Sequence, residues 1–227
     1  MNESRQKVID ATIILLSQSG LSGAGLNDVI ALSGASRGSL YHYFPDGKEQ
    51  WVTEALLLYS ERFWARCDAV ITKAPTVAGG IAAIFHWAGK MMRSHHYRSG
   101  CPVGAVVLDL CAKNEALREV CVQIIKKWER LLAARFSPLP AARARKLAKL
   151  VIGTFEGALM LARLERRSAP FTLAAEQLAV LLNARDASSL VVRRASNRQL
   201  PPPVQRANDG HARRSSHRRQ AGVESEA

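Results

Sequence analysis

The sequence predicts an all-α fold. Apolar residues recur at three- and four-residue intervals along most of its 227 residues, and no segment shows the strict alternation of a half-buried strand. Glycine- and proline-containing breaks divide the pattern into segments of helical length. Apolar side chains make up 48% and charged ones 22% of the chain, an ordinary globular composition, so the chain is expected to bury a substantial core.

In the N-terminal third of the chain, the apolar pattern predicts one helix of medium length, then two short helices and a long one. Asn2 can cap the first helix, and Ser19-Gly20 is expected to end it. Further helices are predicted over residues 26–33, 37–44 and 48–72, with breaks at Gly34-Ala35-Ser36 and Pro45-Asp46-Gly47. The long helix is expected to end before Pro75, because the residue before a proline disfavours helical backbone.

Five more helices are predicted, over residues 77–94, 103–113, 115–135, 141–167 and 172–185. The stretch from Leu147 to Leu164 is apolar almost all round, which a helix tolerates only when it is covered on several sides. This helix and the next, taken from two chains, would form a four-helix bundle and a two-fold dimer. From Asp186 onward, arginine, serine and a proline triplet replace the apolar pattern, so a disordered tail is expected.

Several classes of protein are excluded or disfavoured. The most apolar stretch is interrupted by Glu156 and Arg163, which argues against a transmembrane helix, and Asp10 interrupts the N-terminal apolar run, which argues against a secretory signal. A cytoplasmic location is therefore expected. The four cysteines form no CxxC pair, so neither a disulfide framework nor structural zinc is expected.

The net charge of +13 suggests a polyanionic partner, but its distribution does not identify one binding element. Residues 1–50 carry four basic and five acidic side chains. Residues 126–149 carry eight basic side chains against one acidic, and residues 185–227 carry nine against four. The excess charge therefore lies outside the N-terminal segment.

Residues 26–48 have the dimensions of a helix-turn-helix, since two helices of about eight residues are joined by a turn that contains glycine. Gly34 can adopt the left-handed backbone of a tight turn, and Ser36 is placed to cap the helix that begins at Arg37. The apolar residues expected to pack this pair against the first helix are Val29, Ile30, Leu40 and Phe44.

The segment from Ser33 to Phe44, SGASRGSLYHYF, followed by Lys48-Glu49, resembles the helix-turn-helix signature of the TetR family of repressors, approximately A-G-V-S-x-G-x-x-Y-x-H-F-x-x-K. The turn at 44–48 and the segment GCPVGAVV at 100–107 are similar to the LmrA/YxaF-like branch. The resemblance implies a helix-turn-helix DNA-binding domain over residues 1–50 and a helical effector-binding and dimerisation domain over 51–186. Residues 187–227 would then form a basic disordered tail.

In this interpretation Arg37 presents its guanidinium fork to guanine O6 and N7, while Gly38 lets the helix approach the groove floor. The hydroxyls of Tyr41 and Tyr43 suit phosphate oxygens, although Tyr41 could instead pack against the first helix. The expected DNA-binding residues are Asn27, Ser36, Arg37, Gly38, Ser39, Tyr41, His42, Tyr43 and Lys48. Two positions depart from the family pattern. Ala24-Gly25 replaces a usual threonine, so its phosphate contact is either weakened or taken over by Asn27 and backbone amides, and Tyr43 replaces a usual histidine.

The resemblance also implies a pocket for a small, mostly apolar effector within the helical body. Its expected lining residues are Phe63, Trp87, Met91, Val103, Val107, Trp128, Phe155 and Met160; the alternative is that these residues are plain core. Glu156 would either contact the effector or pair with an arginine, and pairing is favoured. His86, His95 and His96 do not share one helix face, so no metal is expected, and no cofactor is expected either.

The sequence therefore predicts a homodimeric, sequence-specific transcriptional regulator that binds a roughly palindromic operator in double-stranded DNA and is released by a small molecule. Two reading helices about 34 to 36 Å apart, one turn of duplex, would match such an operator. The alternatives are a constitutive DNA-binding protein without an effector and a helical carrier or enzyme. No GxSxG, HExxH or GxxxxGK[ST] motif supports an enzyme.

Overall fold

The computed structural model describes residues 3–109 and 114–183. Within these residues the chain forms nine α-helices and no strand, which confirms the all-α prediction. The helices are α1 (Glu3–Gly23), α2 (Leu26–Ser33), α3 (Arg37–Tyr43), α4 (Lys48–Lys73), α5 (Val77–Ser94), α6 (Pro102–Asp109), α7 (Glu115–Ala134), α8 (Ala141–Glu165) and α9 (Ala169–Asn183). None of these helices is both long enough and apolar enough to span a bilayer.

Most predicted helix ends lie within two residues of the observed ones, but the predicted start of the last helix was wrong. α9 begins at Ala169 rather than at residue 172, because Pro170 occupies its first turn, where a missing N–H breaks no helical hydrogen bond. The first helix is broken at Gly20, as predicted, because the backbone of Gly20 is non-helical, but a further helical turn follows to Gly23. The expected cap at Asn2 and the expected tail lie outside the described residues.

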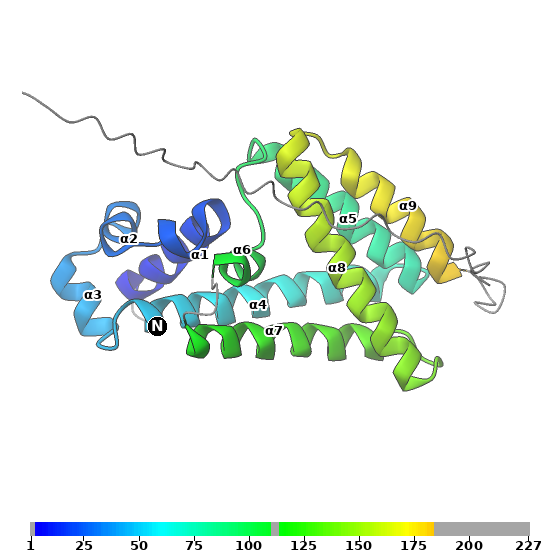
Figure 1. Ribbon diagram of the computed structural model, residues 1–227, viewed down its shortest axis with the longest axis horizontal. Coiled ribbons are helices and arrows are strands. Elements are labelled where there is room, and N and C mark those ends of the chain that lie inside the picture. The colour runs from blue at the N-terminus through cyan, green and yellow to red at the C-terminus, as the bar shows by residue number, and fades with distance from the viewer. Residues whose placement is uncertain (1–2, 110–113, 184–227) are drawn as a thin grey trace, which may run out of the picture. The chain divides into compact units, whose positions relative to one another are not determined.

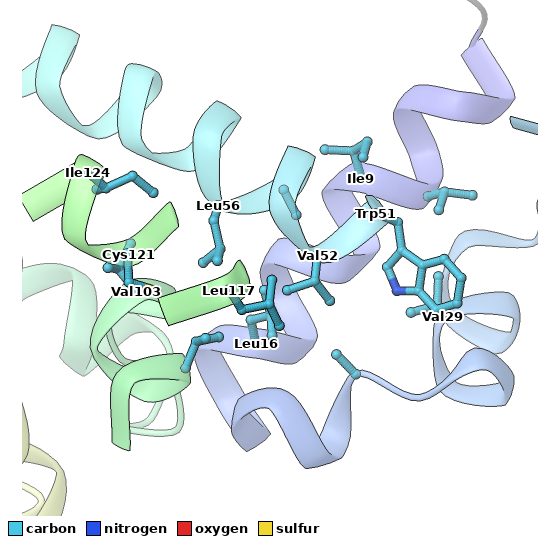
Figure 2. Close-up of a cluster of buried hydrophobic side chains, with 14 of the residues drawn as sticks. Ile9, Leu16, Val29, Trp51, Val52, Leu56, Val103, Leu117, Cys121 and Ile124 are labelled. Carbon is cyan, nitrogen blue, oxygen red and sulfur yellow. The ribbon is translucent and has the colours of Figure 1, made fainter. Parts of the chain in front are cut away.

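One apolar cluster joins the three N-terminal helices to the rest of the protein (Figure 2). Val29 of α2 and Leu40 of α3 are fully buried in it, as predicted, together with Val52 at the start of α4. The same cluster continues to Val103 of α6 and Leu117 of α7. α4 therefore belongs both to the core of the helix-turn-helix and to that of the helical body.

A second cluster fills the space between the far half of α4 and helices α5, α8 and α9. Its centre is a group of phenylalanine rings: Phe155 lies 5.3 Å from Phe85 and 5.9 Å from Phe171, centroid to centroid, both in edge-on geometry. Phe63 of α4 continues the group, with its centroid 5.6 Å from that of Phe155. Aromatic pairs of this kind stabilise a core beyond the area that they bury.

The interruption of α1 at Gly20 is fastened to α6. Gly20 has φ +67°, and the next two N–H groups, of Leu21 and Ser22, donate to one carboxylate oxygen of Asp109, at 2.6 and 3.4 Å. Asp109 thus caps the last turn of α1 from another helix, in the way that an N-cap residue satisfies free N–H groups. Because α3 packs on α1, this contact helps to set the orientation of the reading helix against the body.

We expect Gly20→Ala to lower the free energy of unfolding by about 2 kcal/mol. A non-glycine residue with this positive φ is strained by roughly 1 to 3 kcal/mol, and the new methyl group would collide with the Asp109 carboxylate. Urea denaturation followed by circular dichroism measures the change.

Gly38→Ala is the matched control, since a Cβ at Gly38 has its nearest neighbour, the Ser36 hydroxyl, at an ordinary 3.9 Å. Alanine is the better helix former, so the control should be as stable as the wild type or slightly more stable. Equal destabilisation by both changes would contradict the role given to Gly20.

Candidate nucleic-acid interface and interior cavities

The turn between α2 and α3 has the backbone that the sequence predicts. Gly34 is left-handed, with φ 70° and ψ 9°, and its N–H donates to the carbonyl of Ile30 at 3.0 Å. Ser36 caps α3, since its hydroxyl accepts the N–H of Ser39 at 3.0 Å. Both predictions for this turn are confirmed, and together they fix the direction in which α3 leaves the turn.

The other end of α3 is anchored by its apolar face. Leu40 and Phe44 are fully buried, and Phe44 packs edge-on against Trp51 of α4, with ring centroids 6.4 Å apart. The guanidinium of Arg5 lies 4.9 Å above the Phe44 ring and forms an ion pair with Glu54. α1 and α4 therefore hold α3 from two sides.

The predicted DNA-contacting side chains lie on the opposite face of this unit. Arg37, Tyr41 and His42 are exposed on α3, whereas Tyr43 is partly buried against the core. Tyr41 is 49% exposed, so about half of its side chain remains accessible to a partner. The remaining predicted residues are exposed at Asn27, Ser36 and Gly38 and half-buried at Ser39 and Lys48.

The side chain of Arg37 forms a hydrogen bond within the protein. Its Nη2 donates to Oδ1 of Asn27 at 3.1 Å, which ties the first residue of α3 to the first turn of α2. A guanidinium has five N–H donors, so this bond leaves a fork available for a base edge or a phosphate. The sequence placed both residues among the DNA contacts but gave no sign that they bond to each other.

Lys48 also has a partner within the protein. Its ammonium donates to the carbonyl of Leu21 at 2.7 Å, at the end of α1. Partial burial lowers the pKa of Lys48, while the carboxylates of Asp28 and Asp109 raise it. Since an ammonium carries three donors, the predicted phosphate contact requires the two that Leu21 does not use.

Two hollows in the helical body involve the predicted effector residues. The inner one is small, about 50 Å³, and brings together Phe63, Trp128 and Phe155. The other holds about 390 Å³ between α1, α4, α5, α6 and α8, and Phe63 and Phe155 line it as well. Trp87 and Met91 also line the larger hollow, as do Tyr59 and Leu159, which the sequence interpretation missed although each lies four residues from Phe63 or Phe155.

Three predicted pocket residues do not reach either hollow. Val103 is fully buried in the first apolar cluster, and Val107 is 49% exposed on α6. Met160 is 62% exposed on the outside of α8, because five residues of helix turn it about 140° away from Phe155. Helical periodicity places a residue on a face, but it does not say what covers that face.

Glu156 does not pair with an arginine anywhere in residues 3–109 or 114–183, so the favoured prediction for this residue was wrong. Its carboxyl group lies against Gly104 of α6 and lines the inner hollow. Burial raises the pKa of Glu156, and a hydrogen bond with the Cys101 thiol partly opposes this rise. Burial also raises the pKa of Cys101, which disfavours the reactive thiolate form.

The indole N–H of Trp128 is buried and has no hydrogen-bond acceptor among residues 3–109 and 114–183, and Trp128 lines the same inner hollow as Glu156. A buried donor without an acceptor costs about 1 to 3 kcal/mol. The inner hollow thus combines an apolar wall with one unsatisfied donor and one carboxyl group. Within the part of the chain that the structure describes, no three metal-ligating side chains gather, and this includes His86, His95 and His96.

Two family models match the chain. Residues 8–55 match the model of the bacterial regulatory proteins of the tetR family, and residues 77–177 match the C-terminal domain of LmrA/YxaF-like transcriptional regulators. The first range contains the reading helix, and the second contains most of the helices around the two hollows.

Relatives and solved structures agree with these models. An HTH-type transcriptional regulator of Mycobacterium tuberculosis is 33% identical over 193 residues, which is 81% of this chain and 96% of that protein. The HTH-type transcriptional regulator LmrA of Bacillus subtilis is 30% identical over 170 residues, which is 74% of this chain and 90% of that protein. The crystal structure of a regulatory protein TetR from Rhodobacter sphaeroides superposes with a TM-score of 0.71 at 22% identity, covering 79% of this chain and 98% of that one.

Glu156→Gln tests the buried carboxyl group. Because the pKa of Glu156 is raised, the folded protein keeps a proton that the unfolded chain releases, so the free energy of unfolding falls as pH rises above the ordinary glutamate value of about 4.3. Glutamine cannot ionise. Relative to the wild type, the variant should therefore gain stability between about pH 4 and pH 7, measured by urea denaturation at each pH.

Glu115→Gln is the control, because Glu115 is exposed and its hydrogen bond with Arg118 lowers its pKa. Relative to the wild type, the Glu115→Gln variant should show no gain in the free energy of unfolding as the pH rises. A pH-independent difference between Glu156→Gln and the wild type would contradict a protonated Glu156.

Proposed function

Because this chain belongs to the TetR family of bacterial transcriptional regulators, we propose that it is a homodimeric repressor that leaves its operator when a small, mostly apolar molecule enters the helical body. Members of this family bind DNA and are not enzymes, so the carrier or enzyme alternative is set aside. We further propose the division of roles that the sequence suggests: DNA reading by residues 1–50, and effector binding and dimerisation by residues 51–186.

One observation carries the DNA-reading part of the proposal: α3 is buried along one face and exposes its first residues on the other. Leu40 and Phe44 fix the helix to α1 and α4, while Arg37 stands at its exposed start. A short helix that presents its N-terminal residues to the major groove is how a helix-turn-helix reads base edges. Asn27 holds the Arg37 side chain on this face and reduces the entropy that it loses on binding.

The dimer is supported by apolar surface on the last two helices. The exposed large apolar residues there are Leu150, Met160, Leu161, Leu164, Leu173 and Val180. Gly153 and Gly157 lie on the same helix, α8, and have open space where a Cβ would stand, so a second helix can approach closely. Pairing of α8 and α9 with their copies would form a four-helix bundle and place two α3 helices on a palindromic operator.

The effector part rests on the larger hollow. Its volume of about 390 Å³ falls within the roughly 300 to 1,000 Å³ typical of small-molecule pockets, and its walls come mainly from apolar side chains. Ile13, Ile14 and Ser17 of α1 line it, so a ligand there would press on a helix that supports α3. To weaken operator binding a hundredfold, the ligand must prefer the non-binding conformation by about 2.7 kcal/mol.

A constitutive DNA-binding protein is the second candidate, and the size of the inner hollow favours it. At about 50 Å³ this space holds little more than a water molecule, so the aromatic core is nearly filled without a ligand. A constitutive protein would bind its operator equally well in the presence of any small apolar compound.

Arg37→Ala tests the reading helix. The variant should lose about tenfold or more of its preference for the operator over unrelated DNA, because a guanidinium bidentate to guanine is worth roughly 1 to 3 kcal/mol of discrimination. Lys48→Ala should weaken both kinds of binding and reduce the salt slope by about one unit, as expected for a backbone contact. Fluorescence anisotropy with an operator selected in vitro, at several salt concentrations, measures both.

Arg143→Ala is the matched control, because Arg143 is exposed near the start of α8, outside the N-terminal helices. It should leave the preference for the operator unchanged. If Arg37→Ala and Lys48→Ala gave the same profile, the assignment of base reading to Arg37 would be wrong.

Replacing both Met160 and Leu164 by Glu tests the dimer. Four like charges would then face one another across the bundle, so the variant should sediment as a monomer and lose operator affinity, since each chain would bind only one half-site. Val107→Glu, an equally polar change at an exposed position on α6, should remain dimeric. Analytical ultracentrifugation distinguishes the two, and a dimeric Met160→Glu, Leu164→Glu variant would place the interface elsewhere.

A further inference from the structure

A basic hollow of about 850 Å³ lies where the end of α1, the segment after α5 and the end of α8 meet. We call it the arginine hollow; the residues of it that matter here are Arg93, His96, Tyr97, Arg98, Arg163 and Arg166. It shares no lining residue with the inner hollow, and only Gln18 with the larger apolar one. The site is therefore distinct from the proposed effector pocket.

The four arginines of the arginine hollow lack acidic partners. No carboxylate lines the hollow, and none of the four forms an ion pair with any residue in the described ranges 3–109 and 114–183. Arginines elsewhere in the protein do pair: Arg5 with Glu54, Arg62 with Asp10 and Arg135 with Asp68. All four arginines are exposed, so water and salt screen part of their mutual repulsion, and an anion between them would reduce the repulsion that remains.

Two of these arginines form hydrogen bonds within the protein, but the bonds use few of their N–H donors and do not neutralise their charge. Arg93 donates to the Ser168 hydroxyl at 2.7 Å, and Arg163 donates to the backbone carbonyl of Gln18 at 2.6 Å. Each bond uses one of five donors, so most guanidinium N–H groups of the hollow remain available. The acceptors are neutral, so the positive charge is not compensated.

The backbone of the arginine hollow is strained at three positions. His96, Tyr97 and Arg166 have φ values of 51°, 57° and 53°, and they are the non-glycine residues with positive φ in the described part of the chain. They stand just after α5 and α8, where helices commonly end on a left-handed glycine. All three residues line the hollow, and strained backbone of this kind is found often at ligand-binding sites.

From this arrangement we propose that the arginine hollow binds a small multivalent oxyanion, a molecule that carries phosphate or several carboxylate groups. Guanidinium forks match the oxygen pairs of phosphates and carboxylates and form charge-assisted hydrogen bonds with them. Such a ligand would touch α1 through Gln18 and Ser19 and the body through Arg98 and Arg166. It would thus join the helix that supports the reading unit to the helical body, by a route separate from the apolar pocket.

The test is isothermal titration calorimetry of pyrophosphate into the full-length protein without DNA, at an ionic strength held constant with sodium chloride. The wild type should bind with saturation. Replacing both Arg98 and Arg166 by Gln should reduce the affinity about tenfold or more, because two charge-assisted contacts are lost. Arg98→Gln alone is expected to give a smaller loss of affinity. Because this variant keeps Arg166 at the end of α8, it still tests the proposal if the double variant folds poorly.

The matched control replaces Arg143 and Lys146 by Gln, because both side chains are exposed and neither lines the arginine hollow. It removes the same two charges at the opposite end of α8, about 30 Å away along the helix, and should leave the affinity within about twofold of the wild type. Equal losses in the two double variants, or no saturable binding by the wild type, would overturn the proposal, since either result means non-specific attraction to a basic protein.

Succinate at the same ionic strength identifies the ligand's charged groups. Binding of pyrophosphate alone assigns the site to phosphate-bearing molecules, and binding of both anions assigns it to multivalent oxyanions in general. Because the measurement contains no DNA and no apolar compound, it succeeds or fails independently of the proposed repressor function.

Discussion

The packing of α3 against the start of α4 is the contact on which the rest of the structure depends. Phe44 at the end of α3 is fully buried and meets Trp51 edge-on, and Val52 lies beside them in the same cluster. α4 then runs through 26 residues into the second cluster, where Phe63 faces the two hollows. Because a helix is stiff along its axis, a shift of the far half of α4 would also move α3.

Polar contacts at the end of α1 add a second connection between the same two parts. Asp109 of α6 binds the N–H groups after Gly20, and Lys48 binds the carbonyl of Leu21 from the start of α4. The N–H of Gly100 donates to the carbonyl of Ser17 at 2.7 Å, and Arg163 of α8 reaches Gln18. Three helices and a connecting segment thus converge on the last residues of α1, which makes that short stretch sensitive to rearrangement around it.

The aromatic rings in the helical body separate two spaces that differ in character. Phe63 and Phe155 line both the small inner hollow and the larger outer one, so a movement of these rings that opened the wall between the hollows would join them. Behind them lie the buried carboxyl group of Glu156 and the unsatisfied indole N–H of Trp128. A joined space would offer a ligand apolar walls together with two polar groups, the usual composition of a selective small-molecule site.

The sequence alone determined the all-α class, most helix ends and the turn that presents α3, because these depend on residues within about four positions of one another: Gly34 on Ile30, Ser36 on Ser39. Only the tertiary structure decided which groups meet across helices. It showed the bond from Leu21 to Asp109, 88 residues apart, the Glu156 carboxyl group beside Cys101 instead of an arginine, and the gathering of Arg93, Arg98, Arg163 and Arg166. Periodicity states which face a residue occupies, but the partner of that face depends on how the helices cross, which no short stretch of sequence encodes.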